Sequence, residues 1–280
     1  MNGPIVSVEL LEQHLGDWVI ADCRHNLQDV DAGKRAFEAG HIPGAIFFHL
    51  DRDLSGPAGG DRGRHPLPPV DQWVNTLERA GVGSEQMVVA YDDREGMFAA
   101  RLWWMLRWLG HERVAVLDGG WARWCQEGKP VSAMPAPPRR AVFHARVRPG
   151  ECVDTATVLE HLHDPALMLV DARAADRFRG ENETLDPVGG HIPGARNRPF
   201  RDNLLADGRF KPPAILKAEF EALLGGLPPE RSIHQCGSGV TACHNLLAME
   251  YAGLKGGRLY PGSWSAWCAD RSRPVAVGTP

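Results

Sequence analysis

Cys236 lies in a glycine-rich loop of a kind that supports thiol chemistry. In the stretch "IHQCGSGVTACHN", residues 233–245, apolar residues just before Cys236 predict the end of a short buried strand. From Val240 onward, apolar residues at helical spacing predict a helix. Gly237 and Gly239 permit the positive φ values that direct successive loop N–H groups toward the sulfur. With the partial positive charge of a helix N-terminus, such a cradle favours a thiolate and holds a persulfide.

Other interpretations of this loop explain the residues less well. Free cysteines are commonly small buried apolar residues, and we expect that role for Cys243 on the core face of the helix. A zinc site formed by Cys236, Cys243 and His244 is disfavoured, because structural zinc ligands usually come in pairs separated by two to four residues. A cysteine phosphatase would need an arginine six residues after the nucleophile to bind phosphate, and residue 242 is alanine.

The elements that must position this loop belong to a duplicated chain. The hexapeptide "GHIPGA" occurs at 40–45 and again at 190–195. Upstream of it, "VIADCR" at 19–24 matches "LVDAR" at 169–173, and downstream "DGGWARWC" at 118–125 matches "PGSWSAWC" at 261–268. Three segments recurring in the same order indicate two copies of one domain.

Each copy predicts an α/β domain. Short apolar runs alternate with helical patterns, which is typical of a largely parallel sheet flanked by helices. The proline-rich stretch within 132–151 predicts an extended connection. We therefore expect a first domain over residues 1–134, a linker over 135–150 and a second domain over 151–280. The predicted strands are "WVIAD", "MVVAYD", "RVAVLD", "LMLVDA" and "RSIHQ". In parallel sheets, functional loops lie at the carboxyl ends of the strands.

The two copies differ at the loop that carries the cysteine. Alignment of "VVAYDD" with "SIHQCG" places Asp92 opposite Cys236, and the first copy lacks the glycine-flanked thiol. This asymmetry predicts one catalytic domain, the second, and one inactive domain, the first.

Composition and charge narrow the setting. The chain has 280 residues, a formal net charge of −4 and six cysteines. The charge gives no indication of a nucleic-acid or membrane partner, and the cysteine content is below that of a disulfide scaffold. The first residues lack a secretory signal pattern, and no run approaches the roughly 18 apolar residues of a membrane span. These features predict a cytoplasmic protein.

Together the repeated segments and "CGSGVTA" at 236–242 resemble the tandem-domain rhodanese-like sulfurtransferases over essentially the whole chain. The resemblance implies two tandem rhodanese-like α/β domains and sulfur transfer through a Cys236 persulfide, with no cofactor and no metal. The neutral residues after the cysteine are similar to those of 3-mercaptopyruvate sulfurtransferases, whereas thiosulfate-preferring rhodaneses typically carry basic residues there.

The resemblance also implies roles for particular residues. Cys236 is the expected nucleophile, and Gly237, Gly239, Val240 and Thr241 contribute the N–H cradle. In mercaptopyruvate enzymes a serine two residues after the cysteine works with a histidine and an aspartate of the inactive domain.

Ser238 matches that serine, and His65 and Asp51 match the other two residues in order. As alternatives, Ser238 is a turn residue and His65 a surface residue in a Gly/Pro loop.

Donor binding is only partly matched. Arg177, in "DARAADRF", corresponds to the family's arginine for the donor carboxylate, the alternative being a surface arginine. A second arginine expected between this segment and the second "GHIPG" is missing, since the stretch reads "RGENETLDPVG". Arg196, Arg198 and Arg24 are candidates to replace it.

The leading hypothesis is sulfur transfer from 3-mercaptopyruvate to cyanide or a thiol. Alternatives are a thiosulfate:cyanide sulfurtransferase, a non-enzymatic persulfide carrier and a pure interaction module. The expected partners are a small-molecule donor and acceptor, with thioredoxin among the candidate acceptors.

Overall fold

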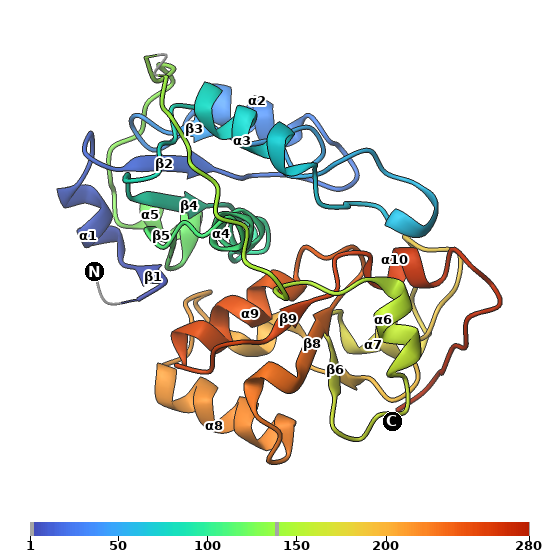
Figure 1. Cartoon of the computed structure of the whole chain (residues 1–280). Helices are drawn as coiled ribbons and strands as arrows, with labels where there is room; N and C mark the ends of the chain where they lie inside the picture. The colour runs from blue at the N-terminus through green and yellow to red at the C-terminus, as the bar shows by residue number, and fades with distance from the viewer. Residues whose placement is uncertain (1–2, 138–139, 280) are drawn as a thin grey trace. The chain divides into compact units, whose positions relative to one another are not determined.

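The computed structural model describes residues 3–137 and 140–279, which belong to two compact units. The first unit comprises Met1–Gly56, Leu67–Arg148 and Ala206–Arg209, and the second Pro57–Pro66, Pro149–Leu205 and Phe210–Pro280. In the sequence, the segment 57–66 lies between two parts of the first unit, but it packs as part of the second unit. Figure 1 follows the chain through both.

The first unit is built on a five-stranded sheet with the order β1-β5-β4-β2-β3. Every strand pair in it is parallel. The central pair, β2 (Val19–Asp22) and β4 (Val88–Tyr91), is in register residue by residue and is buried throughout. Strands covered on both faces are expected to be largely apolar, and of these two strands only β2 carries a charged residue, Asp22 at its end.

The second unit repeats this plan with four strands in the order β7-β6-β8-β9. Its central pair, β6 (Met168–Asp171) and β8 (Ser232–Gln235), is again parallel and in register. The remaining strands are β1 (Ile5–Val6), β3 (Ile46–Phe47), β5 (Val114–Leu117), β7 (Arg196–Asn197) and β9 (Arg258–Leu259).

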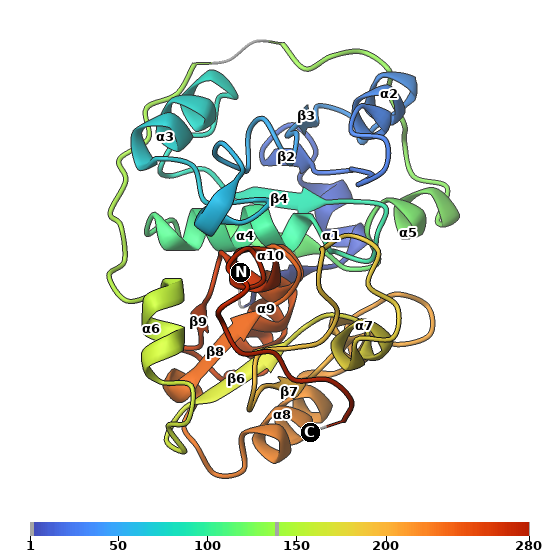
Figure 2. The ribbon, with the colours of Figure 1, turned by 90° about the vertical axis from the view of Figure 1, so that its right-hand side faces the viewer.

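Parallel strands need crossover connections, which are usually helices. In the first unit, α3 and α4 lie on one side of the sheet and α2 and α5 on the other (Figure 2). The helices are α1 (Val8–Gln13), α2 (Ala32–Ala39), α3 (Val70–Arg79), α4 (Ala99–Trp108), α5 (Gly120–Gln126), α6 (Thr155–Glu160), α7 (Ala175–Arg179), α8 (Pro213–Leu224), α9 (Ala242–Tyr251) and α10 (Ser263–Trp267).

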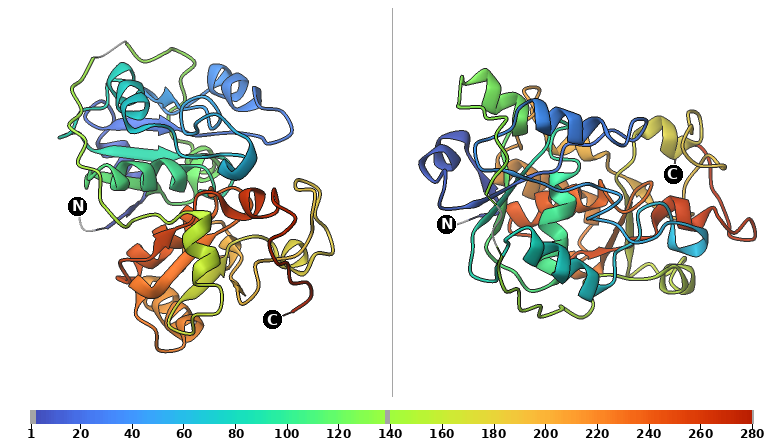
Figure 3. Two further views of the ribbon diagram at one scale, coloured as in Figure 1. Left: turned by 45° about the vertical axis from the view of Figure 1, so that its right-hand side comes forward. Right: turned by 90° about the horizontal axis from the view of Figure 1, so that it is seen from above.

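One apolar cluster in each unit fills the equivalent face of its sheet. In the first unit it joins Leu11 of α1 and Trp124 of α5 to Val89 of β4. In the second it joins Val158 of α6, Phe178 of α7 and Trp267 of α10 to the strands. The chain after α10 returns to α7, where Gly278 N–H donates to the Arg179 carbonyl (Figure 3).

The three repeated segments meet in one buried motif in the first unit. Arg24 forms an ion pair with Asp22 at 2.6 Å and donates to the Gly40 carbonyl at 2.7 Å. Its guanidinium carbon lies 4.4 Å from the Trp121 ring centroid. A buried guanidinium therefore links the end of β2, the "GHIPGA" segment and α5.

The second unit contains the same motif. Arg173 pairs with Asp171 at 2.6 Å, donates to the Gly190 carbonyl at 2.7 Å and lies 4.7 Å from the Trp264 ring centroid. The duplicated residues are thus structural, and the chemical difference between the copies lies in their loops.

The predicted fold class, two tandem α/β domains with parallel sheets, is confirmed. The five predicted strands appear as β2, β4, β5, β6 and β8. The four remaining strands have two residues each and lie at sheet edges, so they carry no pattern that periodicity detects. Across residues 3–137 and 140–279, no helix combines the length and apolar character needed to cross a membrane.

Candidate active site around Cys236

The central strand β8 delivers Cys236 to the carboxyl end of the second sheet. Only 2% of Cys236 is exposed. Its backbone N–H donates to Ser263 Oγ at 3.1 Å, and its carbonyl accepts from the Trp264 N–H at 3.0 Å. The start of α10 therefore fixes the cysteine backbone on both sides.

Ser263 itself adopts an unusual backbone conformation. Its φ is +52°, a left-handed value that costs a non-glycine residue about 1 kcal/mol or more. The equivalent residue of the first unit is Gly120, with φ +55°. A serine at this position supplies the hydroxyl that accepts from Cys236 N–H. The sequence signal was available, since "GSW" replaces "GGW" in the second copy.

The two loop glycines serve different purposes. Gly239 has φ +75°, and a Cβ there would lie 2.5 Å from the Pro261 carbonyl oxygen, so the turn requires glycine. Gly237 does not use this freedom, because its φ is not in the left-handed region. A Cβ at Gly237 would instead lie 3.2 Å from Arg64 Nη2 and 3.7 Å from Arg177 Nη1. Gly237 therefore gives two guanidinium groups close access to the loop.

Val240 and Thr241 lead directly into α9. Their carbonyls accept from the Cys243 and His244 N–H groups, each at 3.1 Å. The helix begins at Ala242, two residues later than the apolar pattern predicts. Its N-terminal turn therefore follows the cysteine loop, as the cradle hypothesis requires.

The side chains after the loop pack in the core. Cys243 is buried, as predicted, and its Sγ lies 3.3 Å from the Gly239 carbonyl oxygen. The His244 ring stacks on Phe210 with centroids 4.7 Å apart, and its Nδ1 lies 3.2 Å from Asn203 Nδ2. These contacts occupy the cysteine and histidine that a zinc site would use.

Ser238 and His65 form a buried pair. His65 Nδ1 lies 2.7 Å from Ser238 Oγ, and the residues are 4% and 6% exposed. Such a pair can hold or move a proton two residues from a nucleophilic thiol. The structure thus brings together two residues that are 173 positions apart in the chain.

Close backbone packing fixes the segment that carries His65. Gly63 has φ +81°, and a Cβ there would lie 2.6 Å from the Gly262 carbonyl oxygen. The Arg64 N–H donates to Ser265 Oγ at 3.0 Å, and Asp61 accepts from Arg273 at 2.9 Å. The short 3₁₀ helix Gly60–Arg62 lies beside α10 (Figure 1).

Arg177, predicted to bind the donor, is one of the two arginines beside Gly237. Its Nε and Nη2 donate to the carboxylate of Glu183 at 2.7–3.1 Å. Burial opposes ionisation of Glu183, but the bonds from Arg177 outweigh it and lower the pKa of this carboxyl group. Glu183 therefore holds the Arg177 guanidinium in a fixed plane.

The second arginine is Arg64, which no sequence motif singled out. Its Nη1 donates to Asp186 Oδ1 at 2.6 Å. Its Nη2 is the atom nearest to the position that a Cβ on Gly237 would occupy. Asp186 lies within the acidic stretch in which an arginine was expected. The signal for Arg64 was its place directly before His65, but its approach to the cysteine loop depends on tertiary packing.

The replacement arginines considered from the sequence are engaged elsewhere. Arg198 pairs with Glu219 at 2.6 Å, and Arg196 is exposed and donates to the Leu223 carbonyl at 3.3 Å. Arg24 is committed to Asp22 in the buried motif of the first unit. These contacts account for the guanidinium groups of all three candidates.

Asp51, the predicted third member of the proton relay, belongs to the first unit. Its carboxylate lies 3.8 Å from His25 Nε2 and 3.9 Å from His49 Nδ1. The three residues place one potential metal ligand each within 4.8 Å of one another. Zinc at about 2.1 Å from each donor would need donors roughly 3.4 Å apart, and His49 Nδ1 already accepts the Asp51 N–H at 3.1 Å. The group is more typical of a hydrogen-bonded cluster than of a closed metal site.

Asp92 occupies the loop position equivalent to Cys236 in the first unit. Its buried carboxylate accepts four backbone N–H groups, from Arg94, Gly96, Phe98 and Ala99, at 2.7–3.0 Å. This architecture therefore surrounds an anion at the end of the central strand. Where the first unit provides its own carboxylate, the second provides a thiol.

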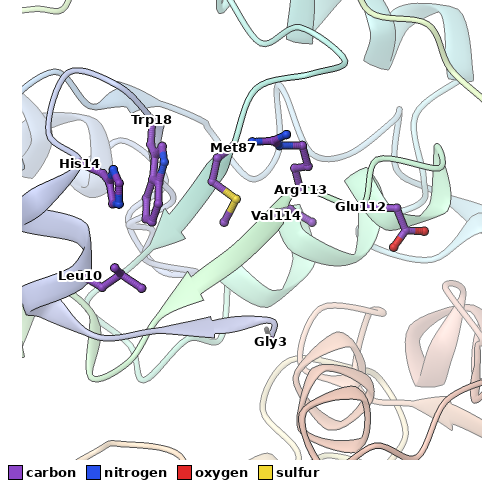
Figure 4. Close-up of a pocket in the computed structure, with 8 residues that line it drawn as sticks. All are labelled: Gly3, Leu10, His14, Trp18, Met87, Glu112, Arg113 and Val114. Carbon is purple, nitrogen blue, oxygen red and sulfur yellow. The ribbon is translucent and has the colours of Figure 1, made fainter. Parts of the chain in front are cut away.

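A hollow on the first unit lies away from these loops. Leu10, Trp18 and Met87 line it together with Arg113 (Figure 4). Met87 and Arg113 directly precede β4 and β5, so the hollow lies at the amino ends of the strands. Functional loops of parallel sheets lie at the opposite ends.

Comparison with known proteins gives a consistent result. The model of the rhodanese-like domain family matches residues 7–127 and 154–270. A probable 3-mercaptopyruvate sulfurtransferase of Pseudomonas aeruginosa is 48% identical over 264 residues, covering 94% of this chain and 93% of that protein. A thiosulfate sulfurtransferase of Mus musculus is 37% identical, covering 84% of this chain and 79% of that protein.

A solved structure supports the same relationship. The crystal structure of SseA from Escherichia coli, described as a 3-mercaptopyruvate sulfotransferase with the rhodanese fold, superposes with a TM-score of 0.82. It is 31% identical in sequence, and the match covers 94% of this chain and all of that one.

Proposed function

This chain belongs to the rhodanese-like domain family, and from that premise we propose that it is a sulfurtransferase that uses 3-mercaptopyruvate as donor and Cys236 as nucleophile. The observation that carries the choice of donor is the Ser238–His65 pair, with 2.7 Å between Oγ and Nδ1, on the loop that bears the cysteine. The relatives with this donor in their names support the same choice.

The first half-reaction forms a persulfide. The Cys236 thiolate attacks the sulfur of the donor, the donor's carbon–sulfur bond breaks, and its electron pair remains on carbon as an enolate. The proton from the donor thiol ends on that carbon, which gives pyruvate and leaves Cys236 as a persulfide anion. This is covalent catalysis with the sulfur held on the enzyme between two steps.

Ser238 and His65 act in the proton movement. Breaking the carbon–sulfur bond requires a proton at the enolate, and the hydroxyl–imidazole pair can relay one because its members are hydrogen-bonded and buried. Arg177 binds the donor carboxylate, for which its planar fork is suited.

Gly237, Gly239, Val240 and Thr241 form the cradle for the persulfide anion. The four N–H groups around Asp92 support this assignment, because they occur in the equivalent loop of the first unit. In the second half-reaction cyanide or a thiolate, including that of thioredoxin, attacks the outer sulfur and restores the Cys236 thiolate. The proposed location of this reaction is the cytoplasm.

The test is a comparison of kcat/KM for 3-mercaptopyruvate and for thiosulfate, with cyanide as acceptor and thiocyanate as the measured product. Cys236→Ser should abolish both activities, whereas Cys125→Ser, a change at an exposed cysteine, should leave them unchanged. Donor without acceptor should add the mass of one sulfur atom to the peptide that contains Cys236.

The outcomes separate the candidate functions. A preference of tenfold or more for 3-mercaptopyruvate, about 1.4 kcal/mol in transition-state binding, supports the proposal. A preference for thiosulfate would replace it with a thiosulfate sulfurtransferase. Absence of turnover in folded, reduced protein would contradict the enzymatic function and favour a persulfide carrier.

A further inference from the structure

We propose that Arg64 and Arg177 together form a carboxylate clamp, and that Glu183 and Asp186 set its charge so that it selects singly charged donors over doubly charged ones. This inference extends the proposed function by assigning the second donor-binding arginine and the residues that determine donor charge. All four side chains belong to the second unit.

The geometry leaves one N–H edge of each guanidinium directed at the cysteine loop. Arg177 uses Nε and Nη2 for Glu183, and Arg64 uses Nη1 for Asp186 and the Leu185 carbonyl. Within the described ranges, Arg177 Nη1 and Arg64 Nη2 have no protein hydrogen-bond acceptor. Both lie within 3.7 Å of the Cβ position of Gly237. A carboxylate beside Cys236 can accept from both.

Buried acids hold the two arginines in this arrangement. The side chains of Glu183 and Asp186 are each 3% exposed. Asp186 Oδ1 receives Arg64, and its Oδ2 lies 3.5 Å from Arg177 Nη2. The acidic stretch that lacks the expected arginine therefore recruits one from the segment 57–66.

The charge of the clamp follows from this pairing. Two guanidinium groups face two carboxylates, so their formal charges cancel before a ligand binds. The neighbouring Arg173 is in turn balanced by Asp171. Hydrogen-bond donors thus point at the ligand without excess positive charge. Hydrogen bonds from these donors are enough to bind a carboxylate with a single negative charge. A dianion such as thiosulfate is in addition repelled by the negative charges of Glu183 and Asp186.

The test uses alkylation of Cys236, which requires no sulfur donor. Iodoacetate carries a carboxylate and iodoacetamide is its neutral analogue; in both cases the thiolate forms a carbon–sulfur bond and iodide leaves. We expect the rate ratio of iodoacetate to iodoacetamide, measured by peptide mass spectrometry, to be about tenfold higher at Cys236 than at exposed Cys125. Arg64→Gln should remove this advantage, and Arg64→Lys should restore part of it. Arg62→Gln, a change at an exposed arginine of the same segment, should have no effect.

Protection experiments test the role of the acids. Pyruvate and sulfate serve as the singly and doubly charged probes, and each should slow iodoacetamide labelling of Cys236. In Asp186→Asn, the protection constant of sulfate relative to pyruvate should improve about fivefold, and kcat/KM should shift toward thiosulfate by a similar factor. Glu181→Gln, at an exposed acid paired with Arg179, is the matched control.

Two results would overturn the inference: an unchanged alkylation ratio in folded Arg64→Gln, or an unchanged sulfate-to-pyruvate ratio in Asp186→Asn. Both readouts are independent of turnover. Selective alkylation without sulfur transfer would leave the clamp standing and contradict the proposed function. Sulfur transfer without selective alkylation would contradict the clamp and leave the proposed function standing.

Discussion

Ser238 and His65 show how a small number of side chains divide the chemistry at the residue scale. In the proposed reaction the Cys236 thiolate attacks the donor sulfur in the same way for either donor, so the thiol alone does not distinguish donors. Transfer from 3-mercaptopyruvate leaves a carbanion that must be protonated, whereas transfer from thiosulfate releases sulfite and requires no proton. A proton relay beside the thiol is therefore useful for one donor and superfluous for the other.

This difference gives a prediction for Ser238→Ala. We expect kcat/KM for 3-mercaptopyruvate to fall about 100-fold, the usual contribution of a positioned proton donor, and that for thiosulfate to fall less than threefold. Steady-state kinetics with cyanide as acceptor measures both. Ser265→Ala is not a suitable control because Ser265 binds the Arg64 backbone; the exposed Ser272 is suitable. Equal losses with both donors would contradict a role in proton transfer.

The loops after β4 and β8 show at the element scale how one architecture serves two purposes. Each loop follows the central strand of a parallel sheet and leads into a helix, α4 or α9. In the first unit the Asp92 carboxylate accepts hydrogen bonds from the converging N–H groups. The loop therefore needs no bound anion and is a structural element. In the second unit Cys236 takes the place of this carboxylate, and in the proposed reaction the transferred sulfur accepts the converging N–H groups.

The Asp92 carboxylate should therefore contribute to stability. Asn in place of Asp92 offers one acceptor oxygen and turns an NH₂ group toward N–H donors that the carboxylate satisfied. We expect Asp92→Asn to lower the free energy of unfolding by about 2–3 kcal/mol, measured by urea denaturation. The control is Asp93→Asn, at the exposed neighbouring residue. It should change the free energy of unfolding by less than about 0.5 kcal/mol, as surface substitutions usually do. Similar stability of the two variants would show that the N–H groups do not depend on the charge.

Strand β8 carries a buried titratable group, His234. Burial lowers the pKa of His234 from 6.5 to about 3. Below pH 6.5 the unfolded chain binds a proton that the folded chain does not, so the stability present above pH 6.5 is lost as the pH falls toward 3. Between pH 6.5 and 5.0 this amounts to roughly 2 kcal/mol.

His234→Val should remove this pH dependence. Valine suits a buried strand, and Ser232 Oγ keeps its bond to the Pro229 carbonyl after the imidazole is gone. Urea unfolding at pH 7.5 and 5.0 should show a smaller loss of stability on acidification in the variant than in the wild type. His163→Gln, at an exposed histidine, should behave as the wild type. Parallel losses in all three proteins would contradict the assignment to His234.

At the scale of the whole molecule, the segment 57–66 departs from the simple division into two sequence halves. It lies within the first copy of the repeat but packs with the second unit, where it places Arg64 and His65 at the cysteine loop. The second unit is therefore assembled from discontinuous parts of the chain, although the duplication alone predicts two contiguous domains.

Gly63→Ala tests this arrangement. A Cβ at residue 63 would collide with the Gly262 carbonyl and displace the segment, so we expect kcat/KM for 3-mercaptopyruvate to fall at least tenfold, through lost positioning of His65 and Arg64. Gly60→Ala is the matched control, because Gly60 also has a positive φ but no atom within 4 Å of its Cβ position. Circular dichroism should show that both variants remain folded. Equal activity of the two would contradict the positioning role of the segment.

Much of the fold was accessible from local patterns. The five longest strands, the parallel α/β class and the duplication follow from apolar runs and repeated segments, because buried parallel strands and their helices impose periodicity on the sequence. The two-residue edge strands and the true role of Gly237 were not accessible. They depend on neighbouring segments and not on the residues themselves.

The sequence by itself determined the glycine-rich loop around Cys236 and the asymmetry between the copies, because these reside in contiguous residues whose types set their chemistry. Only the tertiary structure decided which arginines face the cysteine. Arg196 and Arg198 are nearer to the predicted donor site in sequence, but ion pairing and backbone contacts hold them elsewhere. Asp186, buried where an arginine was expected, requires a cation nearby, and the packing of Gly63 against Gly262 lets the chain supply it from residue 64. Charge compensation in a buried site acts through space, so spacing along the chain does not reveal it.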